Sequence, residues 1–147
     1  TFISSTFWTE RIGPTAALTT LKVMEQKKSW EKITETGMKM QKGWLKLAKE
    51  NNLDITVSGI AAMTSYGFNS TNAAAYKTLI TQEMLKKGFL ASTSFYACTE
   101  HNDGHLDLYF EALSDIYKTI NKCEFEKLDV NILLDGPICH SGFKRLN

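Results

Sequence analysis

The chain has 147 residues, of which 43% are hydrophobic and 22% are charged, and its formal net charge is +1. This length suits one compact domain whose core needs neither disulfides nor a metal. With only 2 Pro and 9 Gly, the composition excludes a fibrous or disordered chain. The near-neutral charge argues against a nucleic-acid partner, and no apolar run approaches the roughly 20 residues of a membrane span. We therefore expect a globular protein with no nucleic-acid and no membrane partner.

The three cysteines, Cys98, Cys123 and Cys139, are too few and odd in number for a disulfide framework. They are typical of a reducing compartment, so we predict a cytoplasmic location. The first residue is Thr1 and not Met, and we expect that the natural N-terminus was cut or left out.

The first half of the chain predicts an extended segment followed by two helices. Residues 1–13 are rich in Ser, Thr and aromatic side chains, which favour an extended backbone. Pro14 is typical of a first helical turn, and the apolar residues after it predict an inward-facing helix over residues 15–26. Ser29 can cap a second helix, for which three- and four-residue apolar steps predict the range 29–51.

The second half alternates between strand and helix patterns. Gly88 is a natural helix end, and Asn102 or Asp103 can cap the last helix. In chain order, apolar periodicity predicts strands over residues 55–59 and 61–68, a helix over 72–87, an extended stretch over 89–98, a helix ending near 121 and a short strand over 130–134.

Few strands, with helices in blocks, predict a two-layer α+β domain. Strands joined by single helices leave a parallel pair possible. The charges are unevenly placed, with eight Lys and three Glu over residues 22–49, and nine acidic residues and three Lys over residues 100–135. We interpret these segments as two solvated helix faces of opposite sign.

Two cysteine–histidine groupings raise the question of a metal or a nucleophile. Cys98, His101 and His105 offer zinc-type ligands, but a fourth ligand is missing and His101 precedes the helix, so we expect no metal site. Cys139 and His140 are adjacent, and adjacent side chains on an extended chain point apart, so we expect no thiol catalyst. Glycine-rich phosphate motifs are absent from the sequence.

A hydroxyl cluster lies near the start of the chain, where Ser4, Ser5 and Thr6 precede the first predicted helix. Hydroxyl groups in a loop that leads into a helix can hold a phosphate. The same residues also make ordinary turn and cap hydrogen bonds. From chemistry alone, both readings of this cluster stay open.

Several motifs in a fixed order resemble one enzyme family. They are Ser5-Thr6-Phe7, the helical run Ala16-Ala17-Leu18-Thr19-Thr20-Leu21-Lys22-Val23-Met24-Glu25, the turn Leu85-Lys86-Lys87-Gly88-Phe89-Leu90, and His101-Asn102-Asp103 followed by Leu106-Asp107. Together they resemble the class III (subgroup II) pyridoxal-phosphate (PLP) aminotransferases, and among these the glutamate-1-semialdehyde aminomutases, over roughly residues 2–117. The family's loop continues with G-N-P, where this chain has Trp8-Thr9-Glu10-Arg11.

The resemblance implies a fold-type I homodimer with its active site at the subunit interface. It implies that residues 1–28 are a loop and helix leading out of the large PLP domain, and that residues 29–147 are the C-terminal small domain. By carry-over, Thr6 hydrogen-bonds the cofactor phosphate in the neighbouring subunit, and Ser5 flanks that contact. The expected partners are the chain's own large domain, the second subunit, and a small-molecule amino donor and acceptor.

The resemblance also implies that essential groups are missing. In this family the Schiff-base lysine and the Asp that pairs with the pyridine nitrogen lie upstream of the Ser-Thr loop, and PLP chemistry depends on both. We therefore place no catalytic residue in this chain and predict that these 147 residues alone are inactive. Thr93-Ser94-Phe95 offers no match to the carboxylate of the aminomutases, so mutase activity and transfer to another aldehyde, ketone or sugar stay open.

An alternative of a different class is a non-catalytic interaction module. It would use the basic amphipathic helix that begins at Lys22 and ends at Lys49 to hold an acidic partner or surface. A natural chain that starts near Thr1 would favour this alternative over the enzyme.

Overall fold

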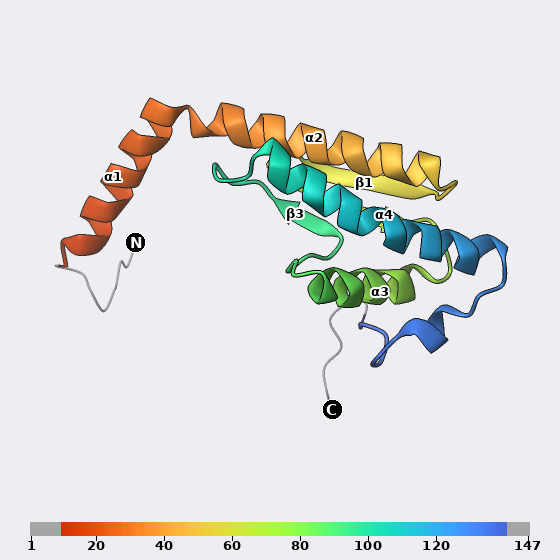
Figure 1. Cartoon of the computed structure of the whole chain (residues 1–147). Coiled ribbons are helices and arrows are strands. Elements are labelled where there is room, and N and C mark those ends of the chain that lie inside the picture. Colours follow the sequence, from red (N-terminus) through yellow and green to blue (C-terminus); the bar gives the residue numbers. More distant parts are fainter. Residues whose placement is uncertain (1–9, 141–147) are drawn as a thin grey trace, which may run out of the picture.

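The computed structural model describes residues 10–140. Figure 1 shows α2 and α4 side by side in front of the sheet, α3 beside α4, and α1 extending away from the rest of the chain. The elements in chain order are α1 (Ile12–Lys27), α2 (Ser29–Glu50), β1 (Ile55–Ile60), β2 (Met63–Phe68), α3 (Ala73–Lys86), β3 (Ser94–Tyr96), α4 (Asp103–Phe125) and the 3-10 turn η1 (Val130–Leu133).

The strands form one antiparallel sheet in the order β1-β2-β3. β1 pairs with β2 through a tight turn, and β2 pairs with β3 after the α3 crossover. Gly59 has a φ of +88°, which costs glycine little. Both pairings within the described residues are antiparallel, so the parallel pair that the sequence left possible is not formed. The two-layer α+β prediction is confirmed.

One face of the sheet is buried under the helices, because strand side chains alternate between faces. Thr64, Tyr66 and Phe68 of β2 point to the helical side and are buried. The register places Ile60, Met63 and Tyr96 in one row on the other face, and all three are exposed.

The core lies between this sheet and the helices. Trp44, Tyr76, Tyr117, Ile80 and Leu113 are each fully buried. Aromatic rings connect the layers, with Tyr66 4.7 Å from Trp44 and Phe68 5.7 Å from Tyr117 between ring centroids. Such tilted and edge contacts suit the ring quadrupole. The described chain therefore has a core of its own, made by α2, α3, α4 and β2.

Helix α1 differs from its prediction in both position and surroundings. It begins at Ile12, two residues before Pro14, and the Glu10 carboxylate accepts hydrogen bonds from the N–H groups of Ile12 and Gly13. Its expected inward-facing side does not exist, because α1 has no buried residue. The apolar pattern predicts the helix correctly, but its apolar side chains face water in the described chain.

Caps at the later helices are partly as predicted. Asn102 caps α4, and its side chain accepts from the His105 N–H at 3.0 Å. Ser29 does not cap α2. Lys28, in the left-handed conformation with φ +47°, separates α1 from α2. Ser29 lies inside α2 and is buried, and its hydroxyl has no hydrogen-bond partner among the described residues.

The tail after α4 is not a strand. The predicted strand over residues 130–134 is the 3-10 turn η1, in which the Asp129 carboxylate accepts from the Asn131 N–H at 2.9 Å. This local bond competes with extended backbone, as Asp side chains often do. Of the extended stretch predicted over residues 89–98, only the three residues of β3 form a strand.

Candidate functional site

The predicted cofactor contacts, Thr6 and Ser5, lie outside the described residues. Their role therefore stays a prediction. The first described residue after them in the sequence is Glu10, whose carboxylate accepts a hydrogen bond from the Gly13 N–H at the start of α1.

The described chain has a pocket of about 450 Å³ where β3, the loop before it and the start of α4 meet. This size lies within the range of small-molecule sites, roughly 300–1,000 Å³. Aromatic and aliphatic side chains make most of its wall, together with two histidines. The lining residues are Met40, Phe89, Leu90, Ala91, Ser94, Phe95, Tyr96, His101, His105, Leu106, Leu108 and Tyr109.

His101 is held in one orientation by its own turn. The Cys98 N–H donates to His101 Nδ1 at 3.0 Å, and the His101 N–H donates to the Cys98 carbonyl at 3.2 Å. The imidazole packs against Phe95 in a tilted arrangement, with 4.8 Å between ring centroids. Burial, and then His105 nearby, lower the pKa of His101 below its ordinary value of 6.5. Since Nδ1 accepts a hydrogen bond, the proton of the neutral ring is on Nε2.

The cysteine–histidine groupings do not assemble a metal centre in the described chain. No three His, Cys, Asp or Glu side chains among residues 10–140 come together as a metal site. Cys139 instead fastens the tail to α3, with its N–H donating to Thr78 Oγ1 at 2.9 Å and its thiol 3.4 Å from the Ala74 carbonyl oxygen.

A cluster of buried polar side chains lies in the core and includes Tyr109, which also lines the pocket. The sequence predicted its members only as core residues. The Trp44 indole N–H donates to the Tyr109 hydroxyl at 3.0 Å. Burial raises the pKa of Tyr109 to about 12 and that of Tyr66 well above its usual range. The hydroxyls of Tyr66 and Tyr117 are buried and have no hydrogen-bond partner among the described residues. In the sequence, the one indication of this cluster is that several tyrosines occupy positions that the periodicity predicts to face the core.

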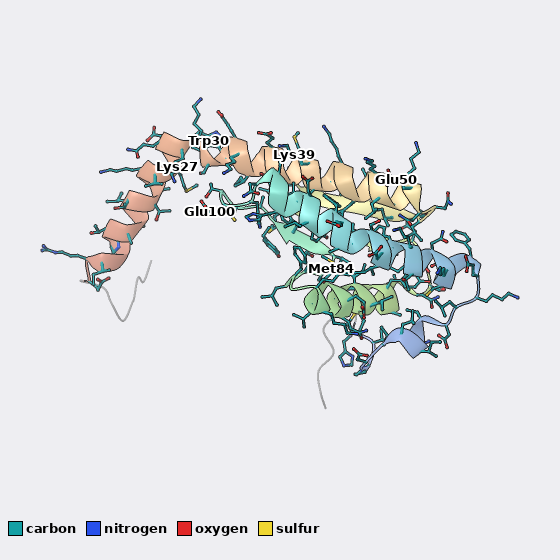
Figure 2. All side chains as sticks on the ribbon, in the orientation of Figure 1. Lys27, Trp30, Lys39, Glu50, Met84 and Glu100 are labelled. Atoms are coloured by element: carbon teal, nitrogen blue, oxygen red, sulfur yellow. The ribbon has the colours of Figure 1, made fainter. Side chains whose placement is uncertain are left out.

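The basic segment is not one helix, and three of its eight lysines, Lys28, Lys39 and Lys46, form ion pairs among the described residues. It divides at Lys28 into the end of α1 and most of α2. Lys39 on α2 lies 2.8 Å from an Asp103 carboxylate oxygen on α4 and 3.1 Å from one of Glu35. Asp103 and then Glu35 raise the pKa of Lys39. Figure 2 shows Lys39 on α2 and the side chains of α1 standing apart from the main body. The two oppositely charged segments therefore meet where α2 runs beside α4.

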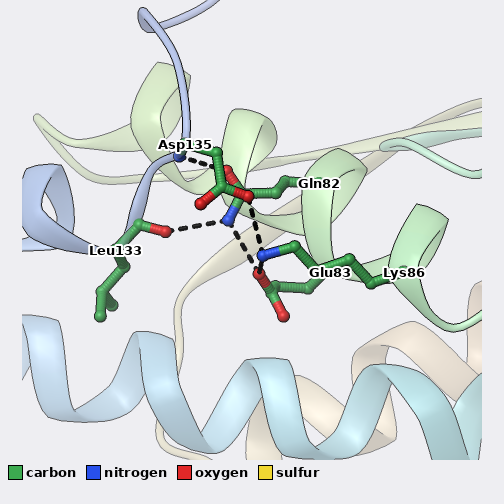
Figure 3. A network of polar contacts seen from close by, with 5 residues as sticks. All are labelled: Gln82, Glu83, Lys86, Leu133 and Asp135. Carbon is green, nitrogen blue, oxygen red and sulfur yellow. Dashed lines mark hydrogen bonds and ion pairs between the residues drawn. The ribbon is translucent and has the colours of Figure 1, made fainter.

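A polar network fastens the tail onto α3 (Figure 3). The Gln82 amide nitrogen donates to the Leu133 carbonyl at 2.9 Å, and its carbonyl oxygen accepts from the Asp135 N–H at 2.7 Å. Lys86 pairs with Glu83 at 2.8 Å and with Asp135 at 2.9 Å. Lys86 lowers the pKa of Glu83. This network attaches the tail to α3, and its arrangement does not resemble a reaction centre.

The described residues do not by themselves fit PLP. A lysine that forms an imine must be neutral, which burial or a nearby cation achieves. Every lysine between residues 10 and 140 is exposed. The pocket is lined by no Lys or Arg side chain that could hold a phosphate.

The fold nevertheless has a counterpart in part of a PLP-containing protein. That solved structure is the PLP internal aldimine form of the FumI protein of Sphingopyxis sp. MTA144, with a TM-score of 0.73 and 18% sequence identity. The match covers 91% of this chain and 33% of that chain, so this chain spans about a third of the length of that protein. At this identity the likeness shows the fold alone. No protein-family model matches the chain.

None of the described helices combines the length and apolar character that crossing a membrane requires.

Proposed function

We propose that this chain is the C-terminal part of a PLP-dependent enzyme of the class III (subgroup II) aminotransferase type. The observation that carries the proposal is the fold match over 91% of the chain to a third of a PLP-containing protein. The order of the motifs from Ser5 to Asp107 points to the same kind of protein on independent grounds. Neither the reaction nor the substrates follow from the fold.

The exposed apolar surface of the described chain supports a role as one part of a larger assembly. Helix α1 carries Ile12, Leu18, Leu21, Val23 and Met24, and each is at least 40% exposed. An isolated 16-residue helix gains little stability in water without a packing partner. In the proposal, residues 1–28 lead out of the large domain and residues 29–147 form the small domain. A large domain and a second subunit then cover α1 and the open face of the sheet.

The proposal gives the chain a supporting role at a site shared between subunits. Thr6 hydrogen-bonds the cofactor phosphate of the second subunit, and Ser5 flanks it. When bound, PLP supplies the electron sink for amino-group transfer between small-molecule donor and acceptor. The imine-forming lysine comes from the upstream region, so the 147 residues alone are inactive. The cytoplasmic location also belongs to the proposal.

The test of the phosphate contact uses the full-length natural gene product. Thr6→Ala removes one hydroxyl, and we expect roughly tenfold weaker PLP affinity or more, because hydrogen bonds to a charged group contribute about 1.5–3 kcal/mol. Thr9→Ala removes a hydroxyl from the same segment and serves as the matched control. Bound PLP is measured by visible absorbance after dialysis, with circular dichroism to show that both variants fold. Equal affinity for both variants would remove Thr6 from the site.

The gene itself tests the larger claim. We expect the natural reading frame to continue upstream of Thr1 through a region that ends in a lysine-bearing strand. A natural chain that starts near Thr1 would contradict the enzyme and favour the interaction module.

A further inference from the structure

The pocket beside β3 combines features that point to a particular kind of ligand. Six of its lining residues carry rings, and they are Phe89, Phe95, Tyr96, Tyr109, His101 and His105. Phe89 and Tyr109 meet edge to face at 6.1 Å between ring centroids, while His101 packs against Phe95 with its ring tilted. Rings arranged in this way can contact a planar aromatic ligand through both their faces and their edges.

The rim of the pocket keeps large apolar side chains in contact with water. Leu90 is 97% exposed and Leu108 is 58% exposed. They come from the loop after α3 and from α4, so the rim is made by separate parts of the chain. An apolar ligand in the pocket would remove this surface from water, which is favourable.

The pocket offers hydrogen-bond donors without a fixed charge. No Asp, Glu, Lys or Arg side chain lines it. The Cys98 N–H occupies His101 Nδ1, so the neutral ring carries its proton on Nε2 and can only donate. No described residue accepts a hydrogen bond from that Nε2.

We propose that this pocket is a binding site for an uncharged aromatic compound that carries a carbonyl or similar hydrogen-bond acceptor. The rings hold the flat body of the ligand, Leu90 and Leu108 cover its exposed edge, and His101 donates to its acceptor. The site does not depend on the proposed enzyme function, since every group in it belongs to the described chain.

The experiment titrates the 147-residue chain with prodan, an uncharged naphthyl ketone whose emission shifts to the blue in apolar surroundings. We expect saturable binding at one site per chain. Leu108→Asp and Leu90→Asp place a carboxylate at the rim and should weaken binding roughly tenfold or more, because desolvating a charge is costly. Leu18→Asp on α1 is the matched control, since Leu18 is 61% exposed and lies outside the pocket. It should leave the affinity unchanged.

Two further titrations test the chemistry of the ligand. His101→Phe keeps a ring but removes the donor, and we expect prodan to bind about threefold to tenfold more weakly, as for one lost hydrogen bond. The anionic probe 1-anilinonaphthalene-8-sulfonate should bind more weakly than prodan. Circular dichroism shows that each variant folds.

Three results would overturn the proposal. One is the absence of saturable prodan binding. Another is binding that Leu108→Asp and Leu90→Asp leave intact, because the probe would then lie elsewhere, for instance on α1. The third is tighter binding of the anionic probe at the same site, which would make the ligand an anion.

Discussion

Gly37 of α2 lies against the main-chain carbonyl of Ala61, in the turn between β1 and β2, so closely that a methyl group at Gly37 would overlap that carbonyl. This contact sets how near the helix can approach the sheet. A backbone carbonyl cannot rotate out of the way as the end of a long side chain can.

Gly37→Ala should therefore destabilise the chain although Ala favours helices. The intrinsic gain in the helix is about 1 kcal/mol, whereas forcing extra volume into a packed contact costs about 1–3 kcal/mol. We expect a net loss of about 1 kcal/mol, measured by urea unfolding. Gly67→Ala is the control, because nothing lies within 4 Å of a methyl group there. Equal stability of the two variants would show that α2 and the turn are not in contact.

The hydroxyl groups of the core tyrosines contribute unequally to the free energy of unfolding, and single substitutions can measure each contribution. Tyr109→Phe leaves the buried indole N–H of Trp44 without its acceptor, so unfolding free energy should fall by about 1–3 kcal/mol. Tyr117→Phe removes a buried hydroxyl that has no partner among the described residues, so the change should be near zero or stabilising. Thermal or urea unfolding measures both. A larger loss from Tyr117→Phe than from Tyr109→Phe would contradict the described hydrogen bonding.

Gln82 should hold the tail more firmly than the ion pairs around it. Its side chain makes two hydrogen bonds to the main chain of the tail, whereas Lys86 is half exposed and its ion pairs contribute little in water. In Gln82→Ala we expect amide exchange at Asp135 to accelerate on the order of tenfold. Lys86→Ala is the control and should change it little. The reverse order would show that charge holds the tail in place.

The turn that holds His101 predicts a dependence of stability on pH. Because the pKa of His101 is lowered in the folded chain, the unfolded chain takes up the proton first as pH falls. The stability that His101 contributes is therefore present above the ordinary pKa of 6.5 and is lost as pH falls through the lower folded value. Urea unfolding of wild type and His101→Phe, from neutral to mildly acidic pH, measures the difference. A difference that grows on acidification in favour of wild type would contradict this sign.

Much of the fold could be predicted because its signals are local. Three- and four-residue apolar steps located α2, α3 and α4, and the Asn102 cap and the end of α3 near Gly88 follow from side-chain and backbone preferences over a few residues. The failures depend on tertiary surroundings. The same periodicity that buries Trp44 in α2 leaves Leu18 of α1 in water.

Other features of the site could not be read from the sequence. No sequence pattern indicated that Gly37 makes room for the main-chain carbonyl of Ala61. The sequence offered His101 and Cys98 as possible metal ligands and predicted no metal site, but it did not show that the backbone N–H of Cys98 donates to the imidazole Nδ1 of His101. The pocket itself brings Phe89, Phe95 and Leu108 together from three separate segments, and no spacing rule connects them.

The central claim is that this chain works as one part of a longer PLP-dependent protein, and cofactor content tests it most directly. The full-length gene product and the 147-residue chain are each dialysed after incubation with PLP, and bound cofactor is measured by visible absorbance. We predict one PLP per full-length chain and none on the 147 residues alone. A full-length product that retains no PLP would contradict the account.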